Sequence, residues 1–250
     1  MLYRILLYYK KCPVFIFNDD SIISKSFFKT KIYYWNELND VNLSCKDTGV
    51  LLGASKYEAT TLKFENGDKI ILWNDTYSNL SEIRQYIFEK AKEKIKDIPP
   101  EIKNISLQIL GRKIYKGSGI INLNTILIVG SFFYCFIYVG YQLIEKPSLF
   151  GVFILPAFFF IGFGFQMNYF IIENDQFIIK NHYFPWRTIS FSLNDILEMD
   201  IEQPNKRSTS VRILTKDFQS KLYGAGSLRQ KNWDELRQDL KYIGIPIRND

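Results

Sequence analysis

Charged side chains are almost absent from the middle of this sequence. The 250 residues include 32 Lys or Arg and 26 Asp or Glu, but residues 119–167 contain only Glu145 and Lys146. Residues 1–118 hold 19 basic and 14 acidic residues, and residues 168–250 hold 12 and 11, so nearly all of the net charge of +6 precedes the uncharged region. This uneven distribution excludes a uniform globular enzyme and a disordered tail protein.

Cysteine and histidine are scarce. The cysteines Cys12, Cys45 and Cys135 are scattered, with no CxxC pair, so the sequence supports neither a disulfide framework nor a zinc site. His182 has no second histidine and no paired carboxylate nearby, which argues against catalysis or metal binding. We therefore expect a protein that is not an enzyme and that binds no cofactor and no metal. The apolar stretch 5–9 is too short for a signal peptide.

Two long uncharged runs predict a pair of membrane helices. A bilayer core requires roughly 20 apolar residues, and residues 120–144 and 149–169 are each long enough to span it. Only a few residues separate them, so they would form an antiparallel hairpin with both flanking blocks on one side. The alternative is a hairpin buried within a soluble domain. The positive-inside rule predicts a cytoplasmic side for both blocks and both termini, because four basic residues precede the first run: Lys103, Arg112, Lys113 and Lys116.

The first block reads as a meander of short strands that ends in a helix. Residues rich in Ile, Phe, Tyr, Thr and Val alternate with Asp, Asn and Gly turns, a pattern typical of antiparallel sheets. Asn66-Gly67 predicts a tight hairpin. A helix is expected over 81–96, with apolar residues four apart. The expected strands are 14–18, 21–28, 31–35, 38–46, 57–66 and 68–74.

The second block repeats this order. Its helix begins at Asn232, with Glu235 at capping-box spacing, or one turn earlier at Ser227, and Gly244 ends it. NDDSIISKSFF matches ENDQFIIKNHYF, and WNELNDVNL matches SLNDILEMDI, which indicates a divergent duplication. The expected strands are 170–174, 177–184, 187–192, 195–203, 210–216 and 220–224.

The turn and strand ENDQFIIKNHYF, the step SLNDILEMDI, the strand SVRILTK and the closing helix WDELRQDLKYIGI resemble the pleckstrin-homology fold. With the helical hairpin, the chain looks like bacterial membrane proteins that carry pleckstrin-homology-like (PH-like) domains. The resemblance implies an α+β membrane protein with two small half-barrel modules, each closed by a C-terminal helix. The expected organisation is a PH-like domain at 1–98, a basic linker at 99–119, membrane helices at 120–144 and 149–169, and a PH-like domain at 170–250.

Two groups of basic residues are candidate head-group contacts. Lys103, Arg112, Lys113 and Lys116 would stand beside an anionic membrane surface, although they also serve simply to set topology. The second group surrounds the second strand, where the resemblance implies phosphate-binding basic residues: Lys25, Lys29 and Lys31. The loop Gly224–Ser227 lacks phosphate-loop spacing and is expected to be a strand-to-helix turn.

The leading functional hypothesis is a non-enzymatic scaffold or protein-interaction module in the bacterial inner membrane, whose sheet edges bind a peptide or partner helix. One alternative is a sensor of anionic lipid or of a small ligand. Another is an accessory or immunity-type subunit of a larger membrane complex. The expected partners are membrane lipid and either another protein or a second copy of the chain. Nucleic acid is not expected, because no basic face is interleaved with base-stacking aromatics.

Overall fold

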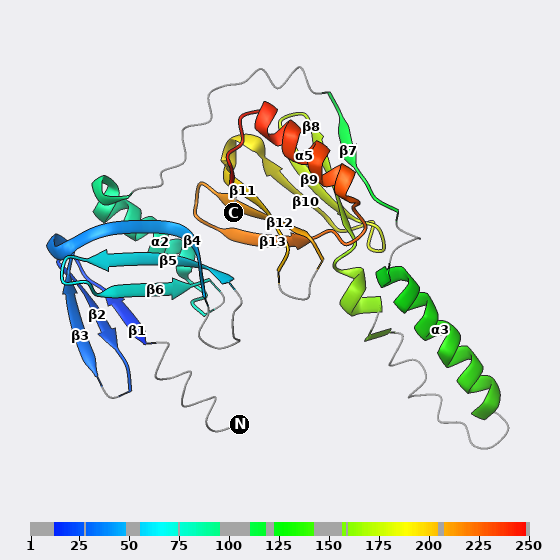
Figure 1. The fold of residues 1–250 in the computed structure, drawn as a ribbon, viewed down its shortest axis with the longest axis horizontal. Helices are drawn as coiled ribbons and strands as arrows, with labels where there is room; N and C mark the ends of the chain where they lie inside the picture. The colour runs from blue at the N-terminus through cyan, green and yellow to red at the C-terminus, as the bar shows by residue number, and fades with distance from the viewer. Residues whose placement is uncertain are drawn as a thin grey trace. The chain divides into compact units, whose positions relative to one another are not determined.

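The computed structural model describes residues 13–27, 29–48, 56–74, 76–95, 111–118, 123–142, 157–158, 160–204 and 208–248. The chain divides into two compact units (Figure 1). Unit 1 comprises residues 1–99 together with the short segment 217–220, and unit 2 comprises residues 100–216 and 221–250.

Unit 1 contains two three-stranded antiparallel sheets followed by a helix. The first sheet has the order β1-β2-β3 and the second the order β4-β5-β6. The elements are β1 (Val14–Phe17), β2 (Ser21–Lys25), β3 (Thr30–Tyr34), a 3-10 helix (Trp35–Glu37), β4 (Leu38–Thr48), β5 (Lys56–Phe64), β6 (Lys69–Trp73), α2 (Leu80–Ala91) and a 3-10 helix (Lys92–Lys94). The hairpin predicted at Asn66-Gly67 is confirmed: it joins β5 to β6, and Gly67 has a φ of 82°.

Unit 2 contains two four-stranded sheets, with orders β10-β9-β8-β7 and β13-β12-β11-β14, and the helix α5. The β7–β8, β8–β9, β9–β10 and β11–β12 pairings are antiparallel, and β14 pairs with β11 in parallel. The elements are β7 (Lys113–Tyr115), α3 (Leu123–Gln142), β8 (Asn168–Glu173), β9 (Gln176–Asn181), β10 (Thr188–Ser192), a 3-10 helix (Leu193–Asp195), β11 (Ile196–Glu202), β12 (Ser210–Thr215), β13 (Ser220–Gly224), α5 (Gln230–Tyr242) and β14 (Ile247–Arg248).

The two units share one order of elements. In each, a hairpin is followed by a third strand, a 3-10 helix, a second meander and a closing helix. The matched Asn-Asp sequences occupy equivalent places: Asn18–Asp20 turns β1 into β2, and Asn174-Asp175 turns β8 into β9. Asn174 and Asp175 both have positive φ, as a tight hairpin turn requires. In unit 2 one strand precedes this common pattern, because β7 pairs with β8.

The core of unit 2 lies between its sheets and α5. Phe170 and Phe177 stack at 5.4 Å between ring centroids, and Trp233 of α5 lies 5.7 Å from Phe170. The predicted apolar face of α5 is confirmed, since Trp233, Leu236 and Leu240 are all buried. The helix begins at Gln230, between the two predicted starts, and Gly244 follows it with a φ of 78°.

The core of unit 1 contains a buried ion pair. Arg84 of α2 places its guanidinium 3.0 Å from a carboxylate oxygen of Glu58 on β5, and both side chains are essentially inaccessible to solvent. The Arg84 Nε also donates a 2.8 Å hydrogen bond to Thr60 Oγ1. The surrounding apolar core includes Leu62 and Ile87, both fully buried.

The predicted membrane hairpin is wrong. In the part of the chain that the structure describes, no helix is long and apolar enough to cross a membrane. The first run lacks charge, but amide and hydroxyl side chains recur along it, and α3 covers only Leu123–Gln142 of the 25 predicted residues. The second run ends early: residues 165–166 form a turn, Met167 bridges to Ala225, and β8 begins at Asn168.

The predictions that depended on those spans are wrong as well. A multi-pass inner-membrane location with cytoplasmic termini is contradicted, and so is the predicted fold class of two modules around a transmembrane hairpin. The described residues instead form four small sheets, and α3 belongs to a segment inserted between the paired strands β7 and β8.

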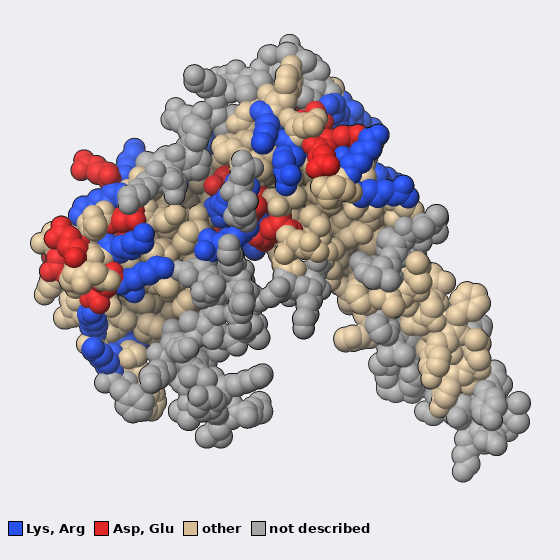
Figure 2. Space-filling view, in the orientation of Figure 1, with Lys and Arg blue, Asp and Glu red and all other residues tan. Residues whose placement is uncertain are grey.

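The alternative of a buried hairpin does not describe α3 either. Phe133 and Ile137 on this helix are 67% and 71% exposed. In Figure 2 basic and acidic side chains are interspersed over the described parts of both units, whereas the sequence of α3 carries no charge.

Candidate functional site

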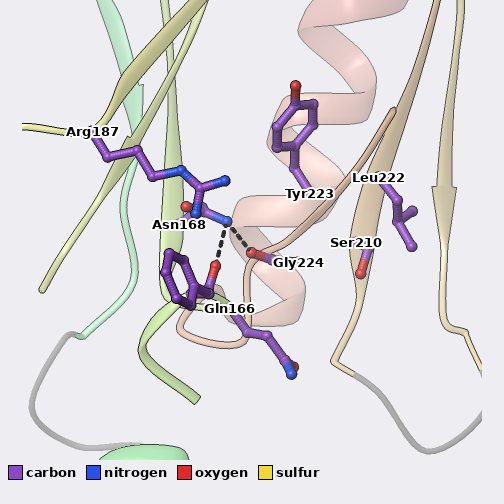
Figure 3. Close-up of a pocket in the computed structure, with 8 residues that line it drawn as sticks. Gln166, Asn168, Arg187, Ser210, Leu222, Tyr223 and Gly224 are labelled. Atoms are coloured by element: carbon purple, nitrogen blue, oxygen red, sulfur yellow. Dashed lines mark hydrogen bonds between the residues drawn. The ribbon is translucent and has the colours of Figure 1, made fainter. Parts of the chain in front are cut away.

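A pocket of about 280 Å³ opens in unit 2 beside β13, an edge strand (Figure 3). Arg187 extends into it from one side, and Leu222 and Ser210 lie on the other. Its walls come from the turn before β8, from β8 itself, from the residue before β10, and from β12 and β13. The lining residues are Phe165, Gln166, Asn168, Arg187, Ser210, Leu222, Tyr223 and Gly224.

Two buried asparagines hold the end of the inserted segment against the sheets. Asn168 Nδ2 donates to the Phe165 carbonyl at 3.1 Å and to the Gly224 carbonyl at 2.8 Å. Asn181 Nδ2 donates to Asn168 Oδ1 at 3.0 Å and to the Gly164 carbonyl at 2.9 Å. Buried amides are expected to be fully hydrogen-bonded, and these bonds tie β8, β9 and β13 together at one wall of the pocket.

A second wall depends on close backbone approach. Ser208 Oγ donates to Gln166 Oε1 at 3.2 Å, and Ser210 Oγ donates to the Ser208 carbonyl at 2.8 Å. The backbone N–H of Gly226 donates to the Gln166 carbonyl at 3.0 Å. A Cβ at Gly224 would lie 3.3 Å from Ser208 Oγ, so glycine fits this position because it has no side chain.

Arg187 supplies the positive charge of the pocket. Its guanidinium lies 5.1 Å from the centroid of the Phe165 ring, a cation–π contact. No lining residue is acidic. Burial raises the pKa of Tyr223, and the positive charge of Arg187 opposes that rise. The pocket therefore carries a cation at one side, and Phe165 and Tyr223 add aromatic surface to a lining that also includes polar residues.

His182 lies just after β9, and its ring contacts two side chains. Its Nε2 is 3.2 Å from Ser227 Oγ, and its ring centroid is 5.0 Å from that of Tyr169. The Ser227 hydroxyl is also 3.4 Å from the Asn168 carbonyl, and Ser227 is buried. A serine that is buried in this way is not accessible to a substrate, so the contact between His182 and Ser227 has a structural role.

We expect the free energy of unfolding to depend on pH through His182. Burial, and secondarily the charge of Lys116, lowers the pKa of His182 below its ordinary value of 6.5. The unfolded state therefore binds more protons below that pH. The stabilisation is complete above about pH 6.5 and is lost as the pH falls toward the folded-state pKa. Urea unfolding of the wild type and of His182→Gln at about pH 7.5 and 5.5 measures it, and an equal loss in both proteins would contradict it.

The three basic residues predicted around β2 do not form one site. Lys25 pairs with Thr30 and Lys31 with Ser24 in the β2–β3 ladder, so the side chains of Lys25 and Lys31 project from opposite faces. Lys31 forms an ion pair with Asp68, and the hydrogen bond to that carboxylate raises the pKa of Lys31. Lys29 is exposed in the turn between the strands.

The basic residues predicted beside the membrane belong to unit 2 where they are described. Lys113 Nζ lies 2.6 Å from Asp239 Oδ1, and Arg112 Nε lies 3.4 Å from Glu173 Oε2. Lys116 Nζ lies 5.1 Å from the centroid of the Tyr169 ring. Lys103 lies outside the described residues. The predicted linker thus contains β7. This strand was not predicted, because its three residues show no pattern of their own.

Strand β7 lies between β8 and α5, in a space between sheet and helix that we call the seam. Tyr115 is buried, and its hydroxyl donates a 2.5 Å hydrogen bond to Asp239 Oδ2 of α5. Burial, followed by that hydrogen bond, raises the pKa of Tyr115. The neighbouring Ile114 points to the opposite face and pairs with Ile171 of β8.

The matching seam of unit 1 has no described strand in it. Half-buried aromatic side chains line it: Phe15 lies 5.8 Å from Tyr77 between ring centroids, and Phe17 lies 6.2 Å from Tyr86 of α2. Beside them, β1 is the edge of its sheet in the part of the chain that the structure describes.

The outer face of the β1-β2-β3 sheet is apolar. Ile16, Ile23 and Ile32 face one another across the three strands. Ile16 is 37% exposed and Ile32 is 50% exposed. A solvated sheet face usually carries polar residues, so this row marks a contact surface.

Other features of the site were partly predictable. Gly224–Ser227 follows β13 and precedes α5, which confirms the predicted strand-to-helix turn. Arg187 was not predicted, because a single arginine after an aromatic turn carries no motif. The described residues contain no group of three or more His, Cys, Asp or Glu side chains that could hold a metal ion.

Neither known family models nor curated proteins match the sequence.

Proposed function

We propose that this protein is a non-enzymatic protein-interaction module in which unit 1 binds an extended segment of a partner protein at the edge of β1. The observation that carries the proposal is the difference between two equivalent edges. In unit 2 the edge of β8 is covered by β7, whereas the equivalent edge of β1 carries no strand among the described residues.

The backbone of β1 is arranged to accept a strand. In the hairpin the N–H of Asn18 donates to the Ser21 carbonyl at 2.9 Å. Successive residues of an antiparallel strand direct their N–H and C=O groups to alternate sides, so those of Phe15 and Phe17 point away from β2. No described strand pairs with these groups, which can form the ladder of an added strand, the mode of recognition called β-augmentation.

Unit 2 indicates which side chains the partner should carry. Phe15 corresponds to Phe170, which pairs with Tyr115, and Ile16 corresponds to Ile171, which pairs with Ile114. The partner residue opposite Phe15 should therefore be large and aromatic, to enter the seam beside α2. The residue opposite Ile16 should be aliphatic, to extend the apolar row on the outer face.

The order of elements supports the resemblance to PH-like modules, since each unit is a meander of short strands closed by one amphipathic helix. The anionic-lipid alternative has less support. Lys25 and Lys31 project from opposite faces of the sheet, and Lys31 is already paired with Asp68.

A peptide with the sequence of residues 111–118, Gly-Arg-Lys-Ile-Tyr-Lys-Gly-Ser, is the probe. We expect it to bind the full chain with a Kd of about 0.1–1 mM, since the contact is short. NMR titration of the full chain should shift the amide signals of Phe15 and Phe17 and slow their hydrogen exchange. A peptide with Ser and Gly in place of the Ile and Tyr should not bind.

Two lysine variants on the same sheet face locate the contact. Ile16→Lys places a charge beside the added strand and should weaken binding at least about tenfold. Ile32→Lys adds the same charge on β3, the far edge, and should leave binding unchanged. Equal effects of the two variants, or shifts confined to β8, would contradict the proposal. Binding seen only after removal of residues 2–9 would assign the edge to the chain's own amino-terminal segment instead.

A further inference from the structure

The pocket of unit 2 contains a cation, Arg187, that no described carboxylate neutralises. Within the described residues no Asp or Glu forms an ion pair with Arg187, whereas Arg212 pairs with Glu202 at 2.7 Å on the neighbouring sheet. Arg187 is half-buried, and the stacking of its guanidinium on Phe165 holds it at the pocket. A guanidinium in this position attracts an anion from solution.

We propose that this pocket binds a small organic anion, a monocarboxylate with an apolar body, whose carboxylate is held by the Arg187 guanidinium. The planar guanidinium presents a fork of N–H donors that matches a carboxylate with two parallel hydrogen bonds. The proposal is independent of strand addition at β1, because the pocket and the edge belong to different units.

Several other polar groups of the lining are already engaged in hydrogen bonds. Both donor hydrogens of the Asn168 amide are directed to backbone carbonyls, and the Ser210 hydroxyl donates to Ser208. The side-chain oxygen Oε1 of Gln166 accepts from Ser208 Oγ. These groups fix the shape of the walls. Arg187 is the one charged residue among those that line the pocket, so recognition of the anion's charge falls to it, and a neutral ligand of the same shape gains no comparable contact.

The remaining lining selects for an apolar body. Phe165, Leu222 and Tyr223 contribute aromatic and aliphatic surface to the lining. Leu222 lies on the side of the pocket opposite Arg187 (Figure 3). The volume of about 280 Å³ lies just below the range of drug-sized pockets, which begins at roughly 300 Å³. A ligand of about ten non-hydrogen atoms suits this space, whereas a nucleotide or a phospholipid does not.

Benzoate and its neutral isostere benzamide test the proposal with the full chain. We expect benzoate to bind with a Kd of about 1 mM, a normal affinity for a ligand of its size, and to shift the NMR signals of Tyr223 and Gly224. Benzamide should bind at least about tenfold more weakly. Arg187→Gln should weaken benzoate binding at least about tenfold and leave benzamide binding unchanged.

Lys221→Gln is the matched control, because Lys221 is an exposed cation on β13 that does not line the pocket. It removes the same charge and should retain wild-type affinity for benzoate. The thermal unfolding of each variant is recorded, so that a loss of folding is not mistaken for a loss of binding. Equal affinities for benzoate and benzamide, wild-type affinity in Arg187→Gln, or no saturable binding by the folded wild type at about 10 mM benzoate would each overturn the proposal.

Discussion

Replacing Arg84 with Met is expected to lower the free energy of unfolding by about 3–5 kcal/mol, because it leaves the carboxylate of Glu58 buried without its cation. The two side chains lie 3.0 Å apart and are almost completely removed from water. The Arg84 Nε hydrogen bond to Thr60 is lost as well. Urea unfolding of the full chain, followed by circular dichroism, measures the loss in the transition of unit 1.

A double variant separates the cost of an unpaired charge from the cost of lost packing. When Arg84 and Glu58 are both replaced by Met, no charge remains buried at this site, and stability should return to within about 2 kcal/mol of the wild type. Lys90→Met is the control on the same helix, since Lys90 pairs with Asp19 at the surface. It should change stability by less than about 1 kcal/mol. A loss in Arg84→Met as small as that in Lys90→Met would contradict this account.

Most strands were predictable because each one carries a local signal. The expected strand 220–224 is observed unchanged, and the expected strand 14–18 is observed as Val14–Phe17. Their residues alternate between core and surface, and turn residues mark their ends. The expected helix 81–96 is α2 followed by a 3-10 turn, so its existence was predictable but its end was not.

The errors arose where structure depends on contacts between distant segments. The absence of charge in residues 120–144 was read as a membrane span, but charge and apolarity are separate properties, and the run includes Asn124 and Ser131. The strand β7 is recognisable only through its partner β8, some fifty residues later, because three residues show no periodicity. The basic residues before the uncharged run suggested a linker. Lys113 in that stretch instead forms an ion pair with Asp239 of α5.

The candidate sites show the same division. The Asn-Asp turns predicted that the two units share one order of elements, and that order allows their strand edges to be compared. In unit 2 β7 pairs with β8, whereas no described strand pairs with the equivalent edge of β1. The pocket was not predictable, since Phe165, Arg187 and Tyr223 are far apart in the sequence and none belongs to a motif. Such a site arises from the packing of β8, β10 and β13, which no local pattern encodes.

Replacing Trp233 with Ala is expected to lower the free energy of unfolding of unit 2 by about 3–5 kcal/mol, the usual cost of removing a large aromatic side chain from a core. Trp233 is 4% exposed and packs against Phe170, at the point where α5 closes the sheets. Trp186 offers a matched control in the same unit, because it is 78% exposed. Trp186→Ala should change stability by no more than about 0.5 kcal/mol. Urea unfolding followed by circular dichroism compares the two, and equal losses would show that α5 does not close the core of unit 2.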